Sequence, residues 1–386
     1  MPIVKFGDVV KRANTKKDRF TTEKLYYVGG EHMETGEYLI RKKGLIAGSN
    51  IGPMFYCGFV KGQVLLASRS PDLKKAGMVT FDGLCSEKTF VIETKDENVL
   101  LQSFLPAIVR SEAFWKYAND NQSGSVNHFI NWSTFANYEF FLPPVEQQRT
   151  AANLLWAMER VKAAYKDLIS KTDALVKSQF IEMFGDPVNN EKSWPTYRFS
   201  DVAVSRLGKM LDKRKQTGQH LHKYLANANV QWFSFDLQSL NQMDFDEADR
   251  KEFELHDGDL LVCEGGEIGR CAIWHGEIAD CYFQKAIHRV RCNTELLLPK
   301  YLGHSFYYHS QKNGFSDIVS SKSTIAHLPG DKLKAMSVIV PPIELQKQFV
   351  SFIEQSDKSK FEAKQALDSL TAAQKALMRQ YLKQEQ

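Results

Sequence analysis

One stretch of this sequence occurs twice. Pro143-Pro144-Val145-Glu146-Gln147-Gln148-Arg149 returns 198 residues later as Pro341-Pro342-Ile343-Glu344-Leu345-Gln346-Lys347. Each copy opens a charged run in which apolar residues recur at steps of three and four, the spacing of one helix face. An internal period describes a whole fold, and a period of this length is too long for a solenoid repeat. The sequence therefore predicts a duplicated unit of one domain followed by one helix.

Both charged runs are predicted to be long helices. No Gly or Pro interrupts the first from Val145 to Phe184, Pro143-Pro144 favours its start, and Gly185-Asp186-Pro187 favours its end. One apolar stripe on each of two such helices is best buried by antiparallel, coiled-coil-like pairing. The residues expected to pack between the helices or against a partner are Leu155, Val161, Leu168, Leu175, Phe180, Ile353, Leu367, Leu370 and Leu377. Two unrelated surface helices are the alternative.

The remaining segments are predicted to be globular domains of the α+β class. The expected division is a first domain at 1–142, a central helix at 143–186, a second domain at 187–340 and a C-terminal helix at 341–386. Both domains open alike, and Val4–Val9 corresponds to Tyr197–Val202. We therefore expect a pseudo-two-fold symmetric chain. Its domains have diverged more than its helices. This difference suggests that two domains on a common helical scaffold bind two different targets.

Composition sets only loose limits on function. The chain has 50 Lys and Arg against 46 Asp and Glu, a weak indication of a polyanionic partner. Six cysteines occur without a Cys-x-x-Cys pair, which favours buried structural thiols over a metal site. No signal-like N-terminus and no run of 18 apolar residues occurs. We expect a cytoplasmic protein that binds no membrane and no metal.

Basic residues cluster after the opening of each domain. Lysine and arginine neutralise phosphates and so position nucleic acid without reading its sequence. The candidate phosphate contacts are Lys16, Lys17, Arg19, Arg41, Lys42, Lys43, Arg69, Lys74, Lys213, Arg214, Lys215 and Arg270. Charge runs are often merely solvated faces, but the runs that follow the two domain openings recur at matching places in both halves. The run Arg41-Lys42-Lys43 and Lys74 occur only in the first half.

Polar and aromatic residues follow one strand in each half. Asn and Gln pair bidentately with adenine, and such loops can read base edges. The base-reading candidates are His32, Asn227, Asn229, Gln231 and Trp232. Turns at strand ends are also rich in Asn and Gly for backbone reasons alone.

No stretch of the sequence predicts catalysis. Glu264–Arg270 fits neither nucleotide-binding pattern and is predicted to be the turn of a β-hairpin. Asp82, Glu93 and Lys95 match a metal-nuclease spacing only loosely and have no second-half counterpart. No methyltransferase Asn/Asp-Pro-Pro-Tyr/Phe motif occurs. The expectation is a chain without catalytic residues.

Two divergent domains alternating with two like helices, each entered through Pro-Pro-x-x-x-Gln, closely resemble the specificity subunit of type I restriction–modification enzymes. The resemblance covers the whole chain, and Gly258-Asp259-Leu260-Leu261 and Ser323-Thr324 add to it. Leu345 and Lys347 depart mildly from Gln147 and Arg149 of the first copy. The resemblance implies a non-catalytic DNA-binding protein of a phage-defence and DNA-methylation system.

In that family each domain is a target recognition domain that reads one half of a bipartite, asymmetric site in double-stranded DNA. The helices set the gap between half-sites and dock two methyltransferase subunits, which restriction subunits join. S-adenosylmethionine, ATP and Mg²⁺ are then expected on the partners and no cofactor on this chain. A protein-binding scaffold without its own sequence readout is the alternative, and a nuclease using Asp82, Glu93 and Lys95 is a third hypothesis.

Overall fold

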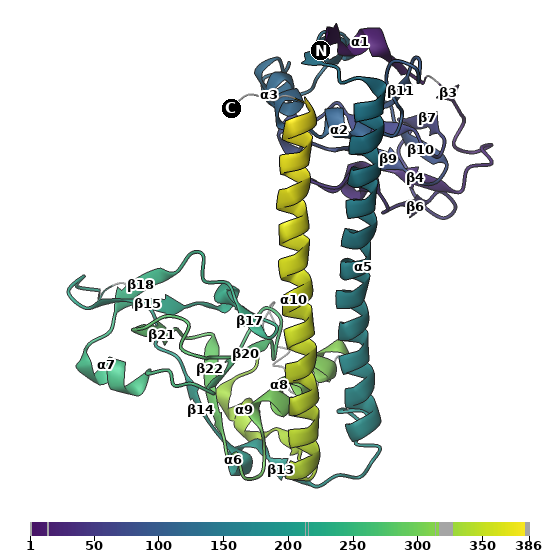
Figure 1. Cartoon of the computed structure of the whole chain (residues 1–386). Coiled ribbons are helices and arrows are strands. Elements are labelled where there is room, and N and C mark those ends of the chain that lie inside the picture. The colour runs from purple at the N-terminus through teal and green to yellow at the C-terminus, as the bar shows by residue number, and fades with distance from the viewer. Residues whose placement is uncertain are drawn as a thin grey trace. The chain divides into compact units, whose positions relative to one another are not determined.

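A computed structural model describes residues 2–13, 15–212, 214, 216–312, 314–315 and 327–382. The chain divides into two compact units: unit 1 contains residues 1–167 and 363–386, and unit 2 contains residues 168–362. Helix α5 (Val145–Phe184) begins in unit 1 and ends in unit 2, whereas α10 (Ile343–Leu382) runs from unit 2 to unit 1 (Figure 1). The units thus divide the chain within the helices. The division into four segments stays a prediction.

Unit 1 contains two five-stranded sheets and a short strand pair. The first sheet has the order β2 (Val10–Arg12), β11 (Thr89–Thr94), β8 (Val64–Ala67), β9 (Ala76–Val79) and β5 (Leu39–Ile40). The second has the order β3 (Thr15–Lys16), β7 (Phe55–Phe59), β10 (Gly83–Ser86), β4 (Tyr26–Val28) and β6 (Gly44–Leu45). Strand β1 (Ile3–Lys5) pairs with β12 (Glu139–Phe141). The helices are α1 (Phe6–Val9), α2 (Leu105–Val109), α3 (Glu112–Asp120) and α4 (Trp132–Ala136), with 3-10 turns η1 (Gly30–His32) and η2 (Pro71–Leu73).

Unit 2 contains a four-stranded sheet, a three-stranded sheet and two strand pairs. The four-stranded sheet has the order β14 (Ala203–Leu207), β22 (Ile287–Cys292), β19 (Leu260–Cys263) and β20 (Cys271–Ile273). The three-stranded sheet has the order β18 (Asn241–Asp244), β15 (Leu221–Leu225) and β21 (Cys281–Phe283). The pairs are β13 (Thr196–Arg198) with β23 (Ser337–Ile339), and β16 (Val230–Gln231) with β17 (Ser234–Phe235). The helices are α6 (Phe199–Val202), α7 (Glu247–Glu252), α8 (Pro299–Gln311) and α9 (Gly330–Ala335), and η4 (Asn227–Asn229) is a 3-10 turn.

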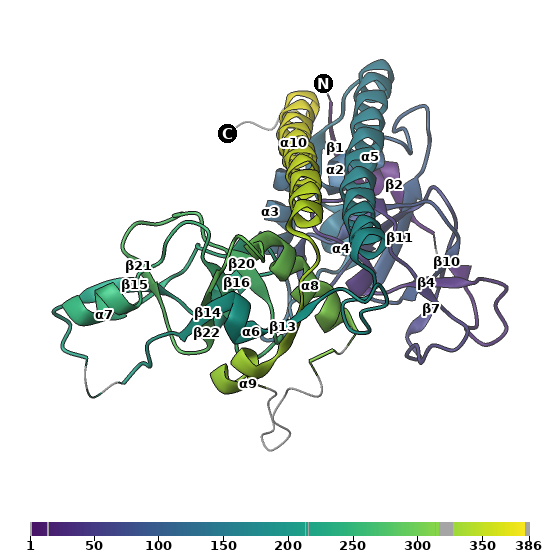
Figure 2. The same cartoon turned by 90° about the horizontal axis from the view of Figure 1, so that it is seen from below.

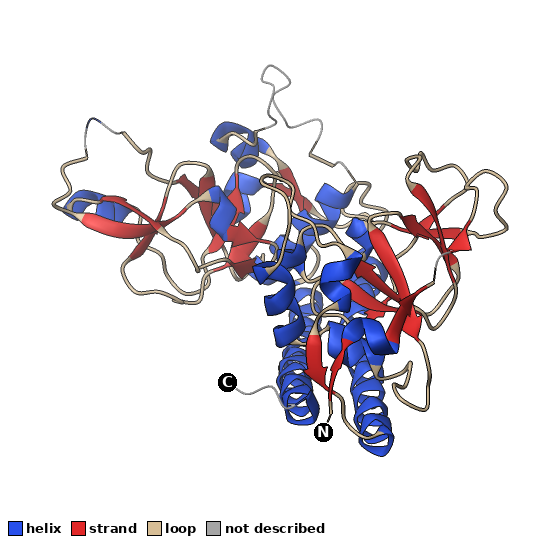
Figure 3. Ribbon diagram, turned by 90° about the horizontal axis from the view of Figure 1, so that it is seen from above, coloured by secondary structure: helices blue, strands red, loops and turns tan. Residues whose placement is uncertain are grey.

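The two units share one internal topology. The order β2-β11-β8-β9 in unit 1 corresponds to β14-β22-β19-β20 in unit 2, and both units pair the first and last strands of their globular part. A parallel pairing also recurs, β4 with β10 and β15 with β21. In unit 2, α8 packs against β20 (Figure 2), and the strands of both units are red in Figure 3. The predicted duplicated α+β fold with two long helices is confirmed.

The glutamine of the repeated sequence motif makes the same set of hydrogen bonds at the start of each long helix. Gln148 Oε1 accepts from Leu101 N–H at 2.9 Å, and its Nε2 donates to the carbonyls of Val99 at 2.9 Å and Pro143 at 2.8 Å. Its side chain is fully buried. These three hydrogen bonds attach the start of α5 to the loop before α2. Breaking them would leave buried amide and carbonyl groups without hydrogen-bond partners, which is costly.

The same pattern occurs in unit 2. Gln346 Oε1 accepts from Leu298 N–H at 2.9 Å, and Nε2 donates to the carbonyls of Leu296 and Pro341, both at 2.8 Å. The middle residues of the motif point elsewhere, since Gln147 is exposed and Leu345 is half-buried. The glutamine therefore explains why the motif recurs with its spacing intact.

Each unit also contains an antiparallel segment of the helix pair. In unit 1, Leu155 shares a core with Met378 and Leu382, and the buried Lys162 donates to Gln374 at 3.2 Å and to Glu159 at 3.0 Å. Residues later in α5 thus contact residues earlier in α10, so the two helix segments are antiparallel in this unit. Burying an ion pair costs desolvation, which this cluster offsets by hydrogen bonding.

In unit 2 the two helices meet through aromatic and charged residues. Phe180 and Phe184 pack against Phe349 with ring centroids 5.4 and 5.3 Å apart. Lys360 of α10 pairs with Asp173 of α5 at 3.0 Å. The two helix segments are therefore antiparallel in this unit as well. The predicted antiparallel pairing is confirmed within each unit.

Some residues predicted for the helix seam lie elsewhere. Leu155, Phe180 and Ile353 are buried, and Leu367, Leu370 and Leu377 are half-buried. Val161, Leu168 and Leu175 are 44%, 48% and 53% exposed, so their burial between the helices is contradicted. Val161 follows Glu159 and precedes Lys162 of the seam, and one residue turns a helix by about 100°, which carries its side chain off the contact face. With Leu154 they form the exposed heptad row: Leu154, Val161, Leu168 and Leu175.

None of the described helices combines the length and the apolar character required to cross a bilayer.

Candidate nucleic-acid interface

His32 and Asn229 hold equivalent turns in the two units. His32 Nδ1 accepts from the backbone N–H of Gly29 at 2.9 Å, and Asn229 Oδ1 accepts from that of Ala226 at 2.8 Å. Each side chain closes the 3-10 turn that it ends, η1 or η4. Because Nδ1 of His32 is an acceptor here, its ring proton lies on Nε2.

Asn229 uses its whole amide inside unit 2. Its Nδ2 donates to the carbonyls of Asp236 at 2.9 Å and Ser239 at 3.2 Å, and the residue is buried. A side chain with all its hydrogen-bonding groups occupied positions the loop and has none left for a base edge. The geometry gives Asn229 this structural role, and base reading by His32 stays a prediction.

Three other predicted residues, Asn227, Trp232 and Arg270, meet at one loop of unit 2. Asn227 Nδ2 donates to the carbonyl of Gly265 at 3.0 Å, and Arg270 Nη2 donates to the carbonyl of Asn227 at 2.8 Å. Trp232 Nε1 donates to Glu267 Oε1 at 2.6 Å, while Arg270 Nη1 lies 3.7 Å from Glu267 Oε2. The loop is the predicted hairpin turn, confirmed by the antiparallel pairing of β19 with β20.

Two polar atoms in and beside this loop are buried without a hydrogen-bond partner: Arg270 Nε in the loop and Asn227 Oδ1 next to it. The Arg270 guanidinium is mostly covered and binds protein groups, whereas Gln231 is exposed and donates to the carbonyl of Ala228 at 2.7 Å. Of these residues Gln231 is exposed, whereas Asn227, Trp232 and Arg270 are half-buried, so Gln231 is the most accessible to an incoming ligand.

In unit 1, basic residues lie along β3 and the loop after it. Lys16 and Lys17 are exposed, with Lys16 Nζ 6.0 Å from the centroid of the Tyr56 ring. Arg19 donates to the carbonyl of Ile51 at 2.6 Å, and its guanidinium lies 4.5 Å from the centroid of Phe20, which is 81% exposed. These side chains offer positive charge beside an aromatic ring, the combination that binds single bases and phosphates.

The second basic group of unit 1 is more strongly engaged. Arg41 lies 3.5 Å from Glu37 and 3.9 Å from Glu159 of α5, and Lys42 pairs with Glu34 at 2.7 Å. Lys43 Nζ lies 3.6 Å from the centroid of Tyr26. An exposed ion pair of this kind is weak and can open to a phosphate, so these positions stay predictions.

The other predicted phosphate contacts are spread over both units. Arg69 is exposed beside the bridge that its backbone makes with Phe129, and Lys74 adopts a left-handed backbone with φ of 48°. Arg214 is exposed. Lys213 and Lys215, like Ser323 and Thr324 of the family motif, lie outside the described residues.

Asp244 is a positioning residue that the sequence did not reveal. Its carboxylate accepts from the backbone N–H of Gly218 at 2.8 Å and of His220 at 2.9 Å, and from Thr217. Burial raises the pKa of Asp244, but these hydrogen bonds outweigh burial and lower it to about 2. Lys209 donates to the Asp244 carbonyl at 2.6 Å. Asp244 thus holds both ends of the loop that contains Arg214, through Lys209 before it and Thr217 to His220 after it.

The nuclease hypothesis gains no geometric support. Asp82 pairs with Lys24 at 2.6 Å, Glu93 pairs with Lys11 at 3.2 Å, and Lys95 donates to the carbonyl of Gly7 at 2.6 Å. Each residue is held by a different group. Among the described residues no group of three or more His, Cys, Asp or Glu side chains is arranged to hold a metal ion.

The cysteines have the environment of structural thiols. Cys85, Cys263, Cys271 and Cys281 are buried and all six thiols are free. Burial raises the pKa of Cys281 to about 12 and that of Cys263 to about 11. A protonated buried thiol is a poor nucleophile and a poor metal ligand.

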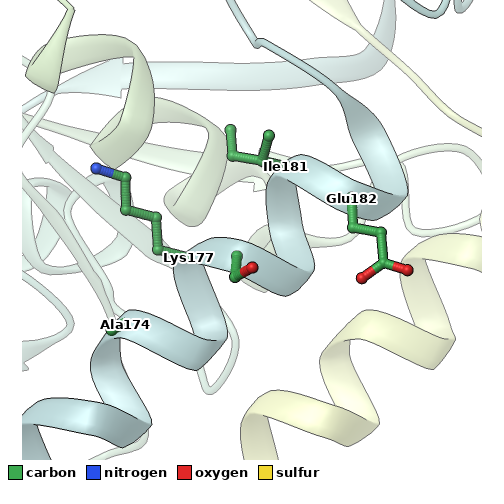
Figure 4. A pocket seen from close by; sticks show the side chains of 5 residues that line it. Ala174, Lys177, Ile181 and Glu182 are labelled. Carbon is green, nitrogen blue, oxygen red and sulfur yellow. The ribbon is translucent and has the colours of Figure 1, made fainter.

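A shallow hollow of about 600 Å³ lies along α5 in unit 2. Its lining residues are Ala174, Lys177, Ser178, Ile181 and Glu182, and Figure 4 shows Lys177 and Glu182 pointing in different directions. Residues from a single helix face enclose little space for chemistry, so the hollow is a feature of the helix surface.

Each unit combines sheets and short helices with a segment of both long helices, and one topology with different surface loops occurs in both units. Residues 191–371 match the model of the type I restriction modification DNA specificity domain. This match covers 181 of the 386 residues and assigns residues 191–371 to that DNA specificity domain.

Individual relatives agree with this assignment. The chain is 35% identical over 98 residues to a putative type I restriction enzyme specificity subunit of Haemophilus influenzae, and 20% identical over 292 residues to the EcoKI specificity subunit of Escherichia coli. These matches cover 25% and 70% of this chain, and 23% and 62% of the relatives' own lengths.

Two solved structures share the fold. The type I restriction–modification S subunit from M. genitalium has a TM-score of 0.60 at 12% identity, covering 100% of this chain and 96% of that one. A chain from a study of complex assembly and conformational transition of a type I R-M system has a TM-score of 0.59 at 17% identity, covering 99% and 97%. At these identities the likeness concerns the fold.

Proposed function

We propose that this chain is the DNA sequence-specificity subunit of a type I restriction–modification system. It recognises a bipartite, asymmetric site in double-stranded DNA and directs methyltransferase and restriction subunits to that site. The observation that carries the proposal is one topology used twice with different surface loops, in a chain whose residues 191–371 match a DNA specificity domain. A shared frame with unlike loops suits a target whose two halves differ.

The contrast between the loops is clearest just after the equivalent turns. His32 and Asn229 hold the same backbone geometry. The residues that follow are Glu34 and Thr35 in unit 1 but Gln231 and Trp232 in unit 2. Side chains with different hydrogen-bonding groups on one backbone path would read different base edges.

The partners are part of the proposal. Two methyltransferase subunits bind the helices, and restriction subunits join the complex. S-adenosylmethionine, ATP and Mg²⁺ belong to those partners, whose pocket would flip the target base out of the duplex. The exposed heptad row supports a docking role, because four apolar side chains at seven-residue steps are the spacing with which a further helix packs.

The deciding experiment maps methylated bases by single-molecule sequencing in cells with and without this gene. A bipartite motif should disappear when the gene is deleted and return when it is restored. An unchanged methylome would contradict the proposal. If purified complexes assemble but bind every duplex equally, the scaffold alternative is correct.

A further inference from the structure

Phe233 has a backbone conformation that aromatic residues rarely adopt. It is the second residue of the two-residue turn between β16 and β17, and its φ is +60°. In this left-handed region Cβ crowds the following carbonyl oxygen, so glycine is the usual occupant. Unit 1 has glycine at the corresponding place: Gly36 lies four residues after His32, as Phe233 lies four after Asn229, and its φ is +91°. Unit 2 therefore has an aromatic ring at a turn position suited to glycine.

The Phe233 ring is held on one face. It stacks on His304 of α8 with centroids 4.2 Å apart and an interplanar angle of 14°. Tyr307 closes one edge at 5.4 Å and 70°. His304 is buried, and burial lowers its pKa to about 3, so the supporting ring is neutral at physiological pH. The orientation of Phe233 is thus fixed before any ligand arrives.

Much of the rest of the ring meets solvent. Phe233 is 45% exposed although it is apolar. Its neighbours in the hairpin, Gln231 and Ser234, are exposed and polar. Trp232, beside it, is tied to Glu267 at 2.6 Å. The result is a flat aromatic surface bordered by hydrogen-bonding groups.

We infer that Phe233 is a stacking platform for a nucleobase that has left the double helix. This inference rests on the proposed function. Base–aromatic stacking tolerates every base because each has a π-face, and that face becomes available only when the base leaves its stack. Gln231, two residues before Phe233 in the hairpin, is exposed, and an amide side chain can bond a base edge.

The surroundings favour a base over a protein side chain. The core of a protein–protein interface is a contiguous apolar area around an aromatic anchor. Around Phe233 the exposed hairpin residues Gln231 and Ser234 are instead polar, Trp232 is held by Glu267, and the supporting stack offers one rigid plane. A planar ligand with polar edges fits this arrangement.

The test uses the full-length chain and duplexes of randomised sequence in which 5-iododeoxyuridine replaces thymidine. Irradiation crosslinks iodouracil to a stacked aromatic ring, and mass spectrometry identifies the peptide. We expect a crosslink on the peptide containing Phe233, with a higher yield from duplexes that contain one unpaired iodouracil. Phe233→Gly should lower this yield and the affinity for the unpaired duplex about ten-fold, whereas Phe233→Tyr should retain both.

Thermal unfolding of the same variants separates function from packing. Glycine is relaxed at φ of +60°, so Phe233→Gly should keep or raise the unfolding midpoint. A lowered midpoint with unchanged DNA binding would mean that the ring only packs, which overturns the inference. Val204→Ala, at an apolar residue of unit 2 that is 73% exposed, is the control for lost apolar surface.

The remaining outcomes distinguish the two proposals. A wild-type chain that binds no duplex, alone or with methyltransferase subunits, contradicts the proposed function itself. Sequence-selective binding without a Phe233 crosslink, and unaltered by Phe233→Gly, overturns only the platform. Loss of a protein subunit from the Phe233→Gly complex, with DNA binding intact, would identify the ring as a protein contact and also overturn it.

Discussion

Gln148 and Gln346 make the same three hydrogen bonds in the two units, each with a fully buried side-chain amide. Both fasten the first turn of a long helix to a loop nearly fifty residues earlier in the chain. The glutamine that both copies of the motif contain thus joins the globular part of each unit to its long helix. Its chemistry is the same whatever the surface loops recognise.

Replacement of Gln148 by Leu should destabilise unit 1. The substitution leaves the N–H of Leu101 and the carbonyls of Val99 and Pro143 buried without partners, at a cost of about 1–3 kcal/mol for each unpaired group. Urea unfolding measures the loss. Gln147→Leu changes the exposed neighbour and is the matched control. If both substitutions lower the free energy of unfolding equally, Gln148 does not attach the helix to the domain in the way proposed.

The stability of unit 2 should depend on acid through Asp244. The folded-state pKa of about 2 lies below the ordinary 3.8, so the ionised carboxylate contributes stability that is complete above the ordinary value. This contribution is lost as the pH falls through the folded value. Asp244→Asn should be less stable at neutral pH and should lose less stability on acidification.

Hydrogen exchange at the amides of Gly218 and His220, which donate to Asp244, measures this effect locally. Asp257→Asn, at a carboxylate that is 80% exposed, is the control. If Asp244→Asn and wild type lose protection at these amides in parallel, the carboxylate is not the responsible group.

The exposed heptad row should bind a partner subunit. Leu168→Asp and Leu175→Asp each place a charge on it, and burial of a leucine contributes about 1.5–3 kcal/mol. Co-purification with the methyltransferase subunit should therefore fall at least about ten-fold, with little change in the thermal midpoint because both side chains are about half exposed. Ser170→Asp, exposed on another face of α5, should bind normally. Undiminished capture by both leucine variants would exclude this row as the docking surface.

Lys16 and Lys17 should contribute to affinity without contributing to sequence preference. Their joint replacement by Ala removes two phosphate-neutralising charges, so the slope of log affinity against log salt should fall by about 2. Fluorescence anisotropy at several salt concentrations measures the slope on target and non-target duplexes. Lys251→Ala, at an exposed lysine of α7 paired with Glu247, should leave it unchanged. A change confined to the target duplex would instead assign these lysines to base reading.

Local sequence signals predicted several elements correctly. The uninterrupted run from Val145 to Phe184 is one helix with those bounds, because proline at its start and Gly185 after its end are encoded beside it. The hairpin turn at Glu264–Arg270 was also predictable, since buried strands flank it directly. The correspondence between His32 and Asn229 was visible as an alignment of the two halves.

Other assignments depended on contacts between distant residues. Asn229 was predicted to read bases, yet its amide is occupied by Asp236 and Ser239. Asp244 carried no sequence signal, because its donors lie more than twenty residues earlier. Phe233 could have been found by aligning it with Gly36, since a bulky residue opposite a glycine indicates strain.

By itself the sequence determined the duplication, the two helices and the resemblance to a known family, because periodicity, helix-ending residues and a repeated motif are properties of neighbouring residues. Only the tertiary structure decided which polar side chains are occupied inside the protein and which are presented outward. It placed Val161, Leu168 and Leu175 on the helix surface and stacked Phe233 on His304. The physical reason is that burial and hydrogen bonding depend on what the rest of the chain brings to each side chain, and that partner is often far away in sequence.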